Sequence, residues 1–292
     1  MKSFSFSFLF SFAFLLFFVE QNFSALKKDI NSVSTSLARR GDGCFNVFLD
    51  VGANIGVHGR FLFEPDKYPH ANISRSIFDL EFGTERDNRD ICSFEFEPNP
   101  AHRHKLQEKS DAYKAMGWRY EYIQAAAGDF EGHMDFYHNA DERFEEWGFS
   151  VKKLHNKSTL EKVPVVRLSS WIKHHIIERN IPSPLGPAKN QTPTIVMKMD
   201  IEGSEYVVLP DLIYSGVLCD LDFVFGEFHP NFAPMDFPGH RIALKTKEEA
   251  MHYKDVFTDF IPTSRNCNAR FKYLDDESYL HDGIPLPSLV AI

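Results

Sequence analysis

The sequence predicts an α/β fold built on a mostly parallel sheet. Three short apolar runs, at residues 47–51, 91–96 and 195–199, each end at or beside an acidic residue and a turn. Short apolar runs closed by turn residues are typical of buried parallel strands. The first run is followed by Gly52 and Gly56, and glycine allows the tight turn by which a strand passes into a helix.

The other elements are arranged around the stretch 47–56, Val-Phe-Leu-Asp-Val-Gly-Ala-Asn-Ile-Gly. In open α/β sheets, a strand, turn and helix of this kind bind nucleotide-like cofactors at the carboxyl edge. Because a glycine at a strand exit is also an ordinary turn, this signal depends on the other strand ends. A nicotinamide-dependent oxidoreductase would carry G-x-G-x-x-G and an acid about 20 residues later. The pattern disfavours that class, because the next strand-end acid, Glu97, follows Gly56 by 41 residues (97 − 56).

The first half of the chain predicts alternating helices and strands. A helix over 57–64 ends before Pro65, and the charged segment 65–90 is expected to be an inserted loop over the sheet edge. A helix over 98–116 has Pro98 near its start and Gly117 after its end. The β-rich patterns predict strands at 91–97, 120–126, 134–137 and 163–168.

The second half continues the alternation. Helical patterns follow at 170–179, 205–212 and 245–260, and strands are expected at 195–199 and 221–225. Residues 182–193 carry several prolines and predict a surface loop, while 147–150 are a candidate loop contact. Strand-like runs at 270–274 and 286–292 suggest an antiparallel addition to the sheet edge.

Acidic residues recur where the predicted strands end. The five are Asp50, Glu97, Asp129, Asp200 and Glu227. The carboxyl ends of parallel strands meet at one edge, where an acid such as Glu97 can accept both hydroxyls of a ribose. A single strand-end acid is more often a solvated turn residue, but this recurrence favours a binding site. Glu202 and Glu205 follow the run 195–199, and they can instead cap the next helix.

The composition excludes nucleic acid as a partner and indicates a secretory route. The chain has 292 residues, with 41 Asp and Glu against 32 Lys and Arg, and no dense basic stripe. Residues 3–19 carry no charge and span about 26 Å as a helix, close to the ~30 Å of a bilayer core. We therefore predict a signal anchor or signal peptide over 1–25, a stem over 26–43 and one domain over 44–292.

The predicted location is a single-pass membrane of the endoplasmic reticulum or Golgi, or secretion. N-glycosylation sequons at Asn72, Asn156 and Asn190 are consistent with this route. The four cysteines allow either buried free thiols or two disulfides, whose pairing the sequence does not select. The sequence has no C-x-x-C motif or Cys/His cluster, so a structural zinc site is not expected.

The motifs and their order resemble the FkbM-type methyltransferases. Over residues 45–230 these motifs are Leu-Asp-Val-Gly-Ala-Asn-Ile-Gly at 49–56, Phe-Glu-Pro-Asn-Pro at 96–100, Lys-Met-Asp-Ile-Glu-Gly-Ser-Glu at 198–205, and Glu-Phe-His-Pro at 227–230. The resemblance implies a class I Rossmann-like fold, a seven-stranded sheet with one antiparallel strand and helices on both faces. It also implies S-adenosyl-L-methionine as cofactor and, typically, O-methylation.

Site residues follow from the same resemblance. Gly52 to Gly56 would pass beneath the methionine part of the cofactor, Glu97 would bind the ribose hydroxyls, and the turn at Asp129 would lie near the adenine. The full set of implied cofactor-binding residues is Asp50, Gly52, Ala53, Asn54, Gly56, Glu97, Asn99, Asp129 and Asp200. Where the family usually has Leu-Asp-Asp, this chain has Leu168, Ser169 and Ser170. Any role of that acid is therefore absent.

The proposed catalytic residues are Asp200, Glu227 and His229. Transfer from a sulfonium needs an in-line acceptor oxygen, and a hydroxyl acceptor gains from a general base. Asp200 is expected beside cofactor and acceptor, and His229 offers a neutral imidazole near pH 7, although a lone histidine is more often structural. A divalent metal on Asp200, Glu202 and Glu227 would suit a diol acceptor, but nothing in the sequence requires one.

The expected acceptor is a glycan or small molecule with a hydroxyl group. Acceptor pockets are built from variable loops, and the candidates are 65–90, 138–162 and 231–243. Two alternatives are a lumenal glycosyltransferase, for which Asp200 and Glu202 would be a weak Asp-x-Asp imitation, and a non-catalytic Rossmann-like binding protein. The second is disfavoured because the cofactor-binding residues are intact.

Overall fold

The computed structural model describes residues 38–139, 146–153, 156–186, 192–232, 246–263, 267, 269–274 and 283–288. The chain divides into two units, residues 1–40 and 41–292, and the helices and strands of the described residues belong to the second. The predicted signal segment and most of the predicted stem lie outside the described residues. Within the described parts, no helix is long and apolar enough to cross a membrane.

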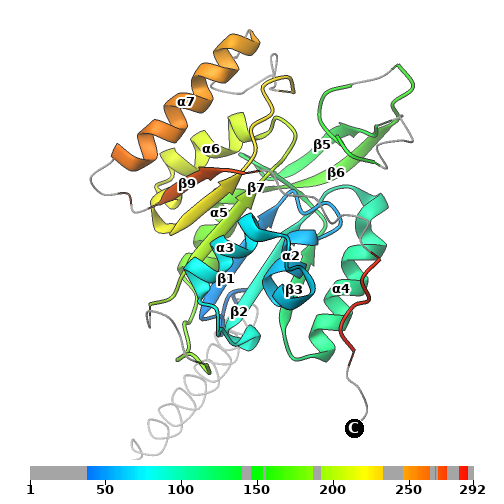
Figure 1. Ribbon diagram of the computed structural model, residues 1–292. Helices are drawn as coiled ribbons and strands as arrows, with labels where there is room; N and C mark the ends of the chain where they lie inside the picture. The colour runs from blue at the N-terminus through cyan, green and yellow to red at the C-terminus, as the bar shows by residue number, and fades with distance from the viewer. Residues whose placement is uncertain are drawn as a thin grey trace, which may run out of the picture. The chain divides into compact units, whose positions relative to one another are not determined.

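A six-stranded sheet forms the centre of the second unit (Figure 1). Its strands, in spatial order, are β3 (Arg119–Ile123), β2 (Ile91–Phe96), β1 (Asn46–Val51), β7 (Ile195–Met199), β8 (Phe223–Gly226) and β9 (Arg270–Tyr273). The three apolar runs thus occupy the centre, where both faces of each strand are buried. The α/β prediction with a mostly parallel sheet is confirmed.

The edge of the sheet differs from the prediction of seven strands with one antiparallel. Among the described residues the sheet has six strands, and all neighbours are parallel, including β8 and β9. The helix α7 (Lys247–Thr263) lies between β8 and β9 in the chain, and a helical crossover returns the chain in the same direction. Residues 286–288, the described part of the strand expected over 286–292, form no strand.

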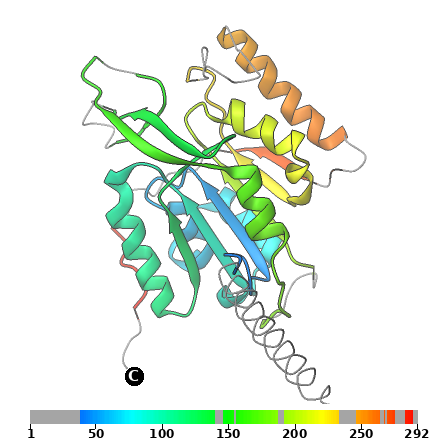
Figure 2. The same ribbon diagram turned by 180° about the vertical axis from the view of Figure 1, so that it is seen from behind.

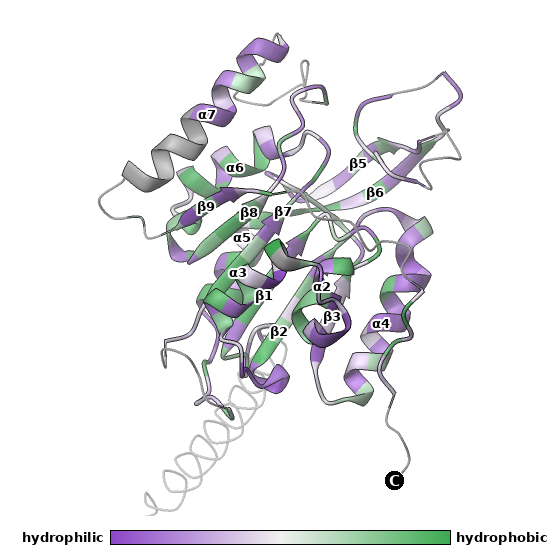
Figure 3. Ribbon diagram, viewed as in Figure 1, coloured by the Kyte–Doolittle hydropathy of each residue, from purple (hydrophilic) through white to green (hydrophobic). Residues whose placement is uncertain are grey.

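Helices cover both faces of the sheet, as the alternation of the strand side chains requires. Val47, Leu49 and Val51 face the core shared with α5 (Leu168–Ile172), α6 (Glu205–Tyr214) and α7. Phe48 points the other way, into the core under α2 (Val57–Phe63), α3 (Asn72–Phe82) and α4 (Arg103–Ala115). Figure 2 brings α5 in front of the sheet, and Figure 3 shows the apolar character of the strands between the helices.

The inserted loop predicted over 65–90 is wrong, because α3 fills its middle. This helix buries Ile77, Phe78 and Phe82, and Phe78 packs edge-on against Phe48 of β1 with ring centroids 4.9 Å apart. Gly83 ends it at φ 92° and ψ 155°, a backbone conformation that glycine adopts without a steric cost. These three apolar residues stand at positions i, i+1 and i+5 among charged residues. The sequence pattern of this segment therefore did not indicate a helix.

The three strands that follow β3 in the chain form a second sheet. It consists of β4 (Ala126–Gly128), β6 (Leu160–Arg167) and β5 (Gly132–Tyr137), in that order. The strand predicted over 120–126 is therefore split, with its last residue opening β4. Asp129 follows β4, so it does not stand at the edge of the main sheet, as the sequence had suggested.

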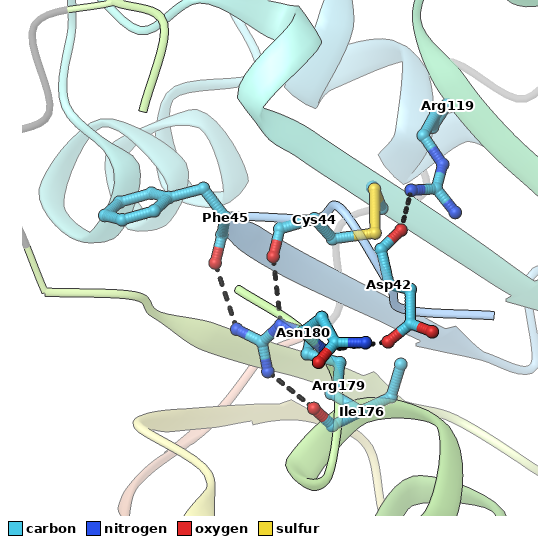
Figure 4. Close-up of a disulfide and its surroundings, with 8 residues drawn as sticks. Asp42, Cys44, Phe45, Arg119, Ile176, Arg179 and Asn180 are labelled. Atoms are coloured by element: carbon cyan, nitrogen blue, oxygen red, sulfur yellow. Dashed lines mark hydrogen bonds between the residues drawn. A yellow bond between two sulfur atoms is a disulfide. The ribbon is translucent and has the colours of Figure 1, made fainter. Parts of the chain in front are cut away.

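The four cysteines, for which free thiols and disulfides were both possible from the sequence, form two disulfides. Cys44 is bonded to Cys92, and Cys219 to Cys267. The first joins the starts of β1 and β2, and Figure 4 shows it beside Arg179, whose guanidinium donates to the carbonyls of Cys44, Phe45 and Ile176 at 3.0, 3.0 and 2.7 Å. The amino end of the sheet is thus crosslinked, away from the edge where ligands bind.

Removing the first disulfide is expected to lower the free energy of unfolding by about 2–4 kcal/mol. The bridge spans a sequence separation of 48, and closing a loop of that length restricts the unfolded chain by roughly 4 kcal/mol in the chain-entropy account. The double variant Cys44→Ser/Cys92→Ser is compared with wild type by urea unfolding, with and without reductant. Equal free energies of unfolding for the variant and the oxidised wild type would contradict the prediction.

Candidate active site

The site lies where the order of the strands reverses. From β1 the chain proceeds outward to β2 and β3, and it later returns to β7, β8 and β9 on the other side of β1. Ligands of open α/β sheets bind at such a switch point, outside the carboxyl ends of the strands. Here the turn after β1 meets the turn after β7, and the amide of Asp200 donates to the carbonyl of Val51 at 2.9 Å.

Gly52 makes this meeting possible. Its φ is +85°, and a Cβ placed on it would lie 1.7 Å from the carbonyl oxygen of Asp200. The residue therefore combines a left-handed backbone with a contact that leaves no room for a side chain. Gly56, at φ +76°, is similarly confined by the Tyr120 hydroxyl, 2.2 Å from the position of a Cβ.

The turn holds the carboxylate of Glu97 from two sides. The amide of Asn54, itself left-handed at φ 50°, donates to Glu97 Oε2, and the amide of Asn99 donates to Oε1, both at 2.8 Å. Burial raises the pKa of Glu97 to about 8, although these two amide bonds act in the opposite direction. Glu97 is therefore fixed in position at the end of β2, with its ionisation near neutral pH.

A pocket opens between the carboxyl edge and the loop that follows β5. Four of the predicted cofactor residues line it together: Gly52, Asn54, Glu97 and Asp200. The other lining residues are Phe96, Pro98, His102, Ala126, Ala127, Phe136, Glu146, Trp147, Gly148, Phe149, Ile201, Glu202 and Ser204. The candidate loop contact at 147–150 thus reaches the pocket through its first three residues.

Beneath the pocket, a buried row of charged side chains crosses the three central strands. Glu95, Asp50 and Lys198 occupy matching register positions on β2, β1 and β7. Lys198 Nζ donates to the carbonyl of Gly52 at 2.6 Å and lies 3.2 Å from Asp200 Oδ2 and 3.7 Å from Asp50 Oδ1. Burial raises the pKa of Asp50 to about 6, while Lys198 lowers it. Lys198 therefore connects the glycine turn to both acids.

A second group of acids surrounds His229. Its Nδ1 lies 3.0 Å from Glu205 Oε1, and its Nε2 lies 3.3 Å from Glu227 Oε2, 3.7 Å from Asp200 Oδ1 and 3.9 Å from Glu202 Oε2. Burial lowers the pKa of His229, but its hydrogen bonds to Glu205 and Glu227 outweigh burial and raise the pKa to about 12. The expected neutral imidazole is therefore not the favoured form, because carboxylates lie against both ring nitrogens.

The remaining predicted residues lie behind the pocket wall. Asp50 is fully buried, and Ala53 and Gly56 pack under the turn. Asn99 positions Glu97 and caps the following turn by accepting from the Ala101 amide at 3.0 Å. Asp129 does not line the pocket; Ala126 and Ala127, just before it, do. Glu227 and His229 reach the pocket only through Asp200 and Glu202.

Sequence reasoning gave no role to His102, Phe136, Glu146 or Lys198. Lys198 had a visible signal, since it is the one charge within the apolar run 195–199. Glu146 belongs to a loop whose position depends on the distant Asn99, whose side-chain amide donates to the Glu146 carbonyl at 3.4 Å. No local pattern predicts such a contact.

Comparison with known proteins gives a match to one family model and to a solved structure. The family model for the methyltransferase FkbM domain matches residues 50–254. No curated protein matches the chain. A crystal structure of a methyltransferase FkbM from Methylobacillus flagellatus KT is similar at 18% sequence identity with a TM-score of 0.30. That match covers 58% of this chain and 29% of the other, so this chain spans less than a third of that protein's length.

Proposed function

The chain belongs to the FkbM methyltransferase family, and from this premise we propose that it transfers the methyl group of S-adenosyl-L-methionine to a hydroxyl oxygen of a glycan or small molecule in the secretory pathway. The observation that carries the proposal is that the glycine turn after β1 and the carboxylate of Glu97, which the turn holds, line one pocket. Family membership also favours a methyltransferase over the glycosyltransferase and non-catalytic alternatives.

The residues fit this cofactor. A Cβ on Gly52 would strike the Asp200 backbone, so glycine lets the turn after β1 pack directly against the turn after β7, and both turns line the pocket. Glu97 lines the pocket with its carboxylate fixed by two amides, as a strand-end acid that binds a ribose diol requires. Ala126, Phe136 and Phe149 provide an apolar part of the wall for an adenine ring.

The chain's own residues have two tasks in the reaction. The cofactor, when bound, supplies an electrophilic methyl group on a positively charged sulfur. The pocket must hold the acceptor hydroxyl in line with that group and exclude water. Asp200 and Glu202 line the pocket and can accept the hydroxyl proton as the new oxygen–carbon bond forms. His229, held protonated, keeps these carboxylates in place rather than acting as the base.

Replacing Glu97 by glutamine is expected to weaken S-adenosylmethionine binding by at least tenfold, or about 1.4 kcal/mol. The amide cannot accept hydrogen bonds at both of its ends. Calorimetric titration of the full-length protein measures the change, and Glu85→Ala, at an exposed position outside the pocket, serves as control. Folded wild-type protein that binds no S-adenosylmethionine would overturn the proposed function.

The same affinity is expected to rise with pH and level off above about pH 8. Below the Glu97 pKa of about 8 the free protein holds a proton that must leave before the carboxylate can accept both ribose hydroxyls, so affinity should gain about tenfold per pH unit. His102, with Nδ1 3.8 Å from Glu97 Oε1, and the more distant Lys198 and Asp50 also face this group. Glu97→Gln should lose this slope while retaining any titration of the cofactor; an equal slope in both proteins would exclude Glu97 as its origin.

The acceptor and the location are supported by separate features. The disulfides favour an oxidising compartment, and Asn156 of one sequon is exposed.

Transfer of labelled methyl groups to hydroxyl-bearing glycans should give a product stable to mild alkali, as an ether is and a methyl ester is not. In the native host, Cys44 and Cys92 should resist thiol alkylation until reduced; immediate alkylation would argue against the secretory route.

A further inference from the structure

The imidazole of His229 has its two nitrogens in different surroundings. Nδ1 contacts one fully buried carboxylate, Glu205, at 3.0 Å. Nε2 instead faces three carboxylates that converge from two turns, Asp200 and Glu202 after β7 and Glu227 after β8. The ring is thus a link between a buried acid and a group of acids that reaches the pocket.

Glu205 is fixed, so the orientation of the ring is fixed too. Its Oε1 accepts from the amide of Ile201 at 2.9 Å, and its Oε2 accepts from the amide of Gly203 at 2.8 Å. Nδ1 of His229 therefore donates its hydrogen to a carboxylate that cannot turn away. A carboxylate that holds one nitrogen and directs the other outward is the usual support of a metal-binding histidine.

The spacing of the atoms around Nε2 suits one cation. Neighbouring ligands at about 2.1 Å from an octahedral ion lie about 3.0 Å apart. The three carboxylate oxygens lie 3.3–3.9 Å from Nε2, so small rotations bring them to that spacing.

Charge and conformation support the same conclusion. Four carboxylates face one imidazole, and the nearby Lys198 is shared with Asp50, so acidic groups outnumber basic groups around His229. Glu202 adopts a left-handed backbone (φ 52°), and its Oε2 is shielded from solvent without accepting a hydrogen bond. The imidazole of His229, with Nε2 3.9 Å from this oxygen, is too distant for a hydrogen bond, so Oε2 keeps the capacity to bind a cation.

We propose that Asp200, Glu202, Glu227 and Nε2 of His229 bind one divalent cation, Mg²⁺ or Mn²⁺, with Glu205 orienting the histidine. Carboxylates and one imidazole match the preferences of these ions, Mn²⁺ in particular. The ion takes the position of the Nε2 proton, which leaves to solvent.

The cation would also define the class of acceptor, a consequence that rests on the proposed function. Asp200 and Glu202 line the pocket, so the ion's remaining coordination positions face it. An acceptor with two adjacent oxygens, such as the vicinal diol of a sugar, can occupy two of these positions. A coordinated hydroxyl loses its proton more readily, so the ion then assists the step assigned above to the carboxylates.

The test is titration of the full-length protein with Mn²⁺ alone, without cofactor or acceptor, followed by calorimetry and electron paramagnetic resonance. We expect one ion per chain, nitrogen hyperfine coupling from His229, and at least tenfold weaker binding in Glu227→Gln and in His229→Asn. Glu85→Ala should bind as wild type does. Circular dichroism establishes that each variant is folded.

Two results would overturn the proposal: dissociation constants weaker than about 1 mM in wild type, or binding unchanged in both folded variants. Because no cofactor is present, these results are independent of S-adenosylmethionine binding. Protein that binds the cofactor but not Mn²⁺ would sink the cation site and keep the methyltransferase function. Protein that binds Mn²⁺ through His229 but not the cofactor would support the site and sink the function.

Discussion

Gly52→Ala is expected to lower the free energy of unfolding by roughly 3–5 kcal/mol and to abolish binding of S-adenosylmethionine. A left-handed backbone at φ +85° costs a residue with a side chain about 1–3 kcal/mol. In addition, the new methyl group would lie 1.7 Å from the Asp200 carbonyl oxygen, so the ends of β1 and β7 must separate. Their separation would also displace Asp200 and the carbonyl that accepts from Lys198.

Gly216→Ala isolates the backbone contribution. Gly216 has φ +79°, nearly the same conformation, but nothing lies within 4 Å of the position of its Cβ. Urea unfolding of the two variants therefore separates strain from collision. We expect Gly216→Ala to lose only the strain and to keep its cofactor affinity. Equal losses in the two variants would show that the approach of β1 and β7 has no energetic consequence.

The fold could be predicted where a single local pattern decided it. The runs around Phe48, Phe94 and Met197 are buried on both faces, and their composition requires a central parallel strand. The segment containing α3 failed because its burial depends on Phe48 of another element, which a window of residues 65–90 does not contain. The direction of β9 failed for a similar reason, since strand direction depends on the path of the intervening chain.

In the candidate site, too, local patterns predicted some features, while contacts between distant segments decided the others. The sequence placed Gly52 and Glu97 at the pocket because both stand at the ends of strands whose local patterns are clear. The protonation of His229 was not predicted, because it depends on four acids brought together from two turns. Glu205 was expected to cap a helix, and in fact its carboxylate binds two amides of the preceding turn as well as His229. The sequence identifies groups that can ionise; their charge depends on packing.

Lys198→Met is expected to destabilise the protein by about 3–5 kcal/mol, more than any surface substitution. The ammonium group is almost fully buried, with a side chain 3% exposed, and it balances Asp50, which is not exposed at all. Methionine fills a similar volume, but it leaves Asp50 without its positively charged partner and removes the hydrogen bond to the Gly52 carbonyl. Chemical denaturation measures the loss, and cofactor titration should show weakened binding because the glycine turn loses its support.

The double variant Lys198→Met/Asp50→Asn distinguishes lost pairing from lost packing. When both charges of a buried pair are replaced, neither is left unpaired, so the double variant should be more stable than Lys198→Met alone. Packing damage would instead add to the effect of Asp50→Asn. Recovery in the double variant would show that the row of charges beneath the pocket is held together by charge balance. Cofactor affinity should recover less, because Asp50→Asn does not restore the donor to Gly52.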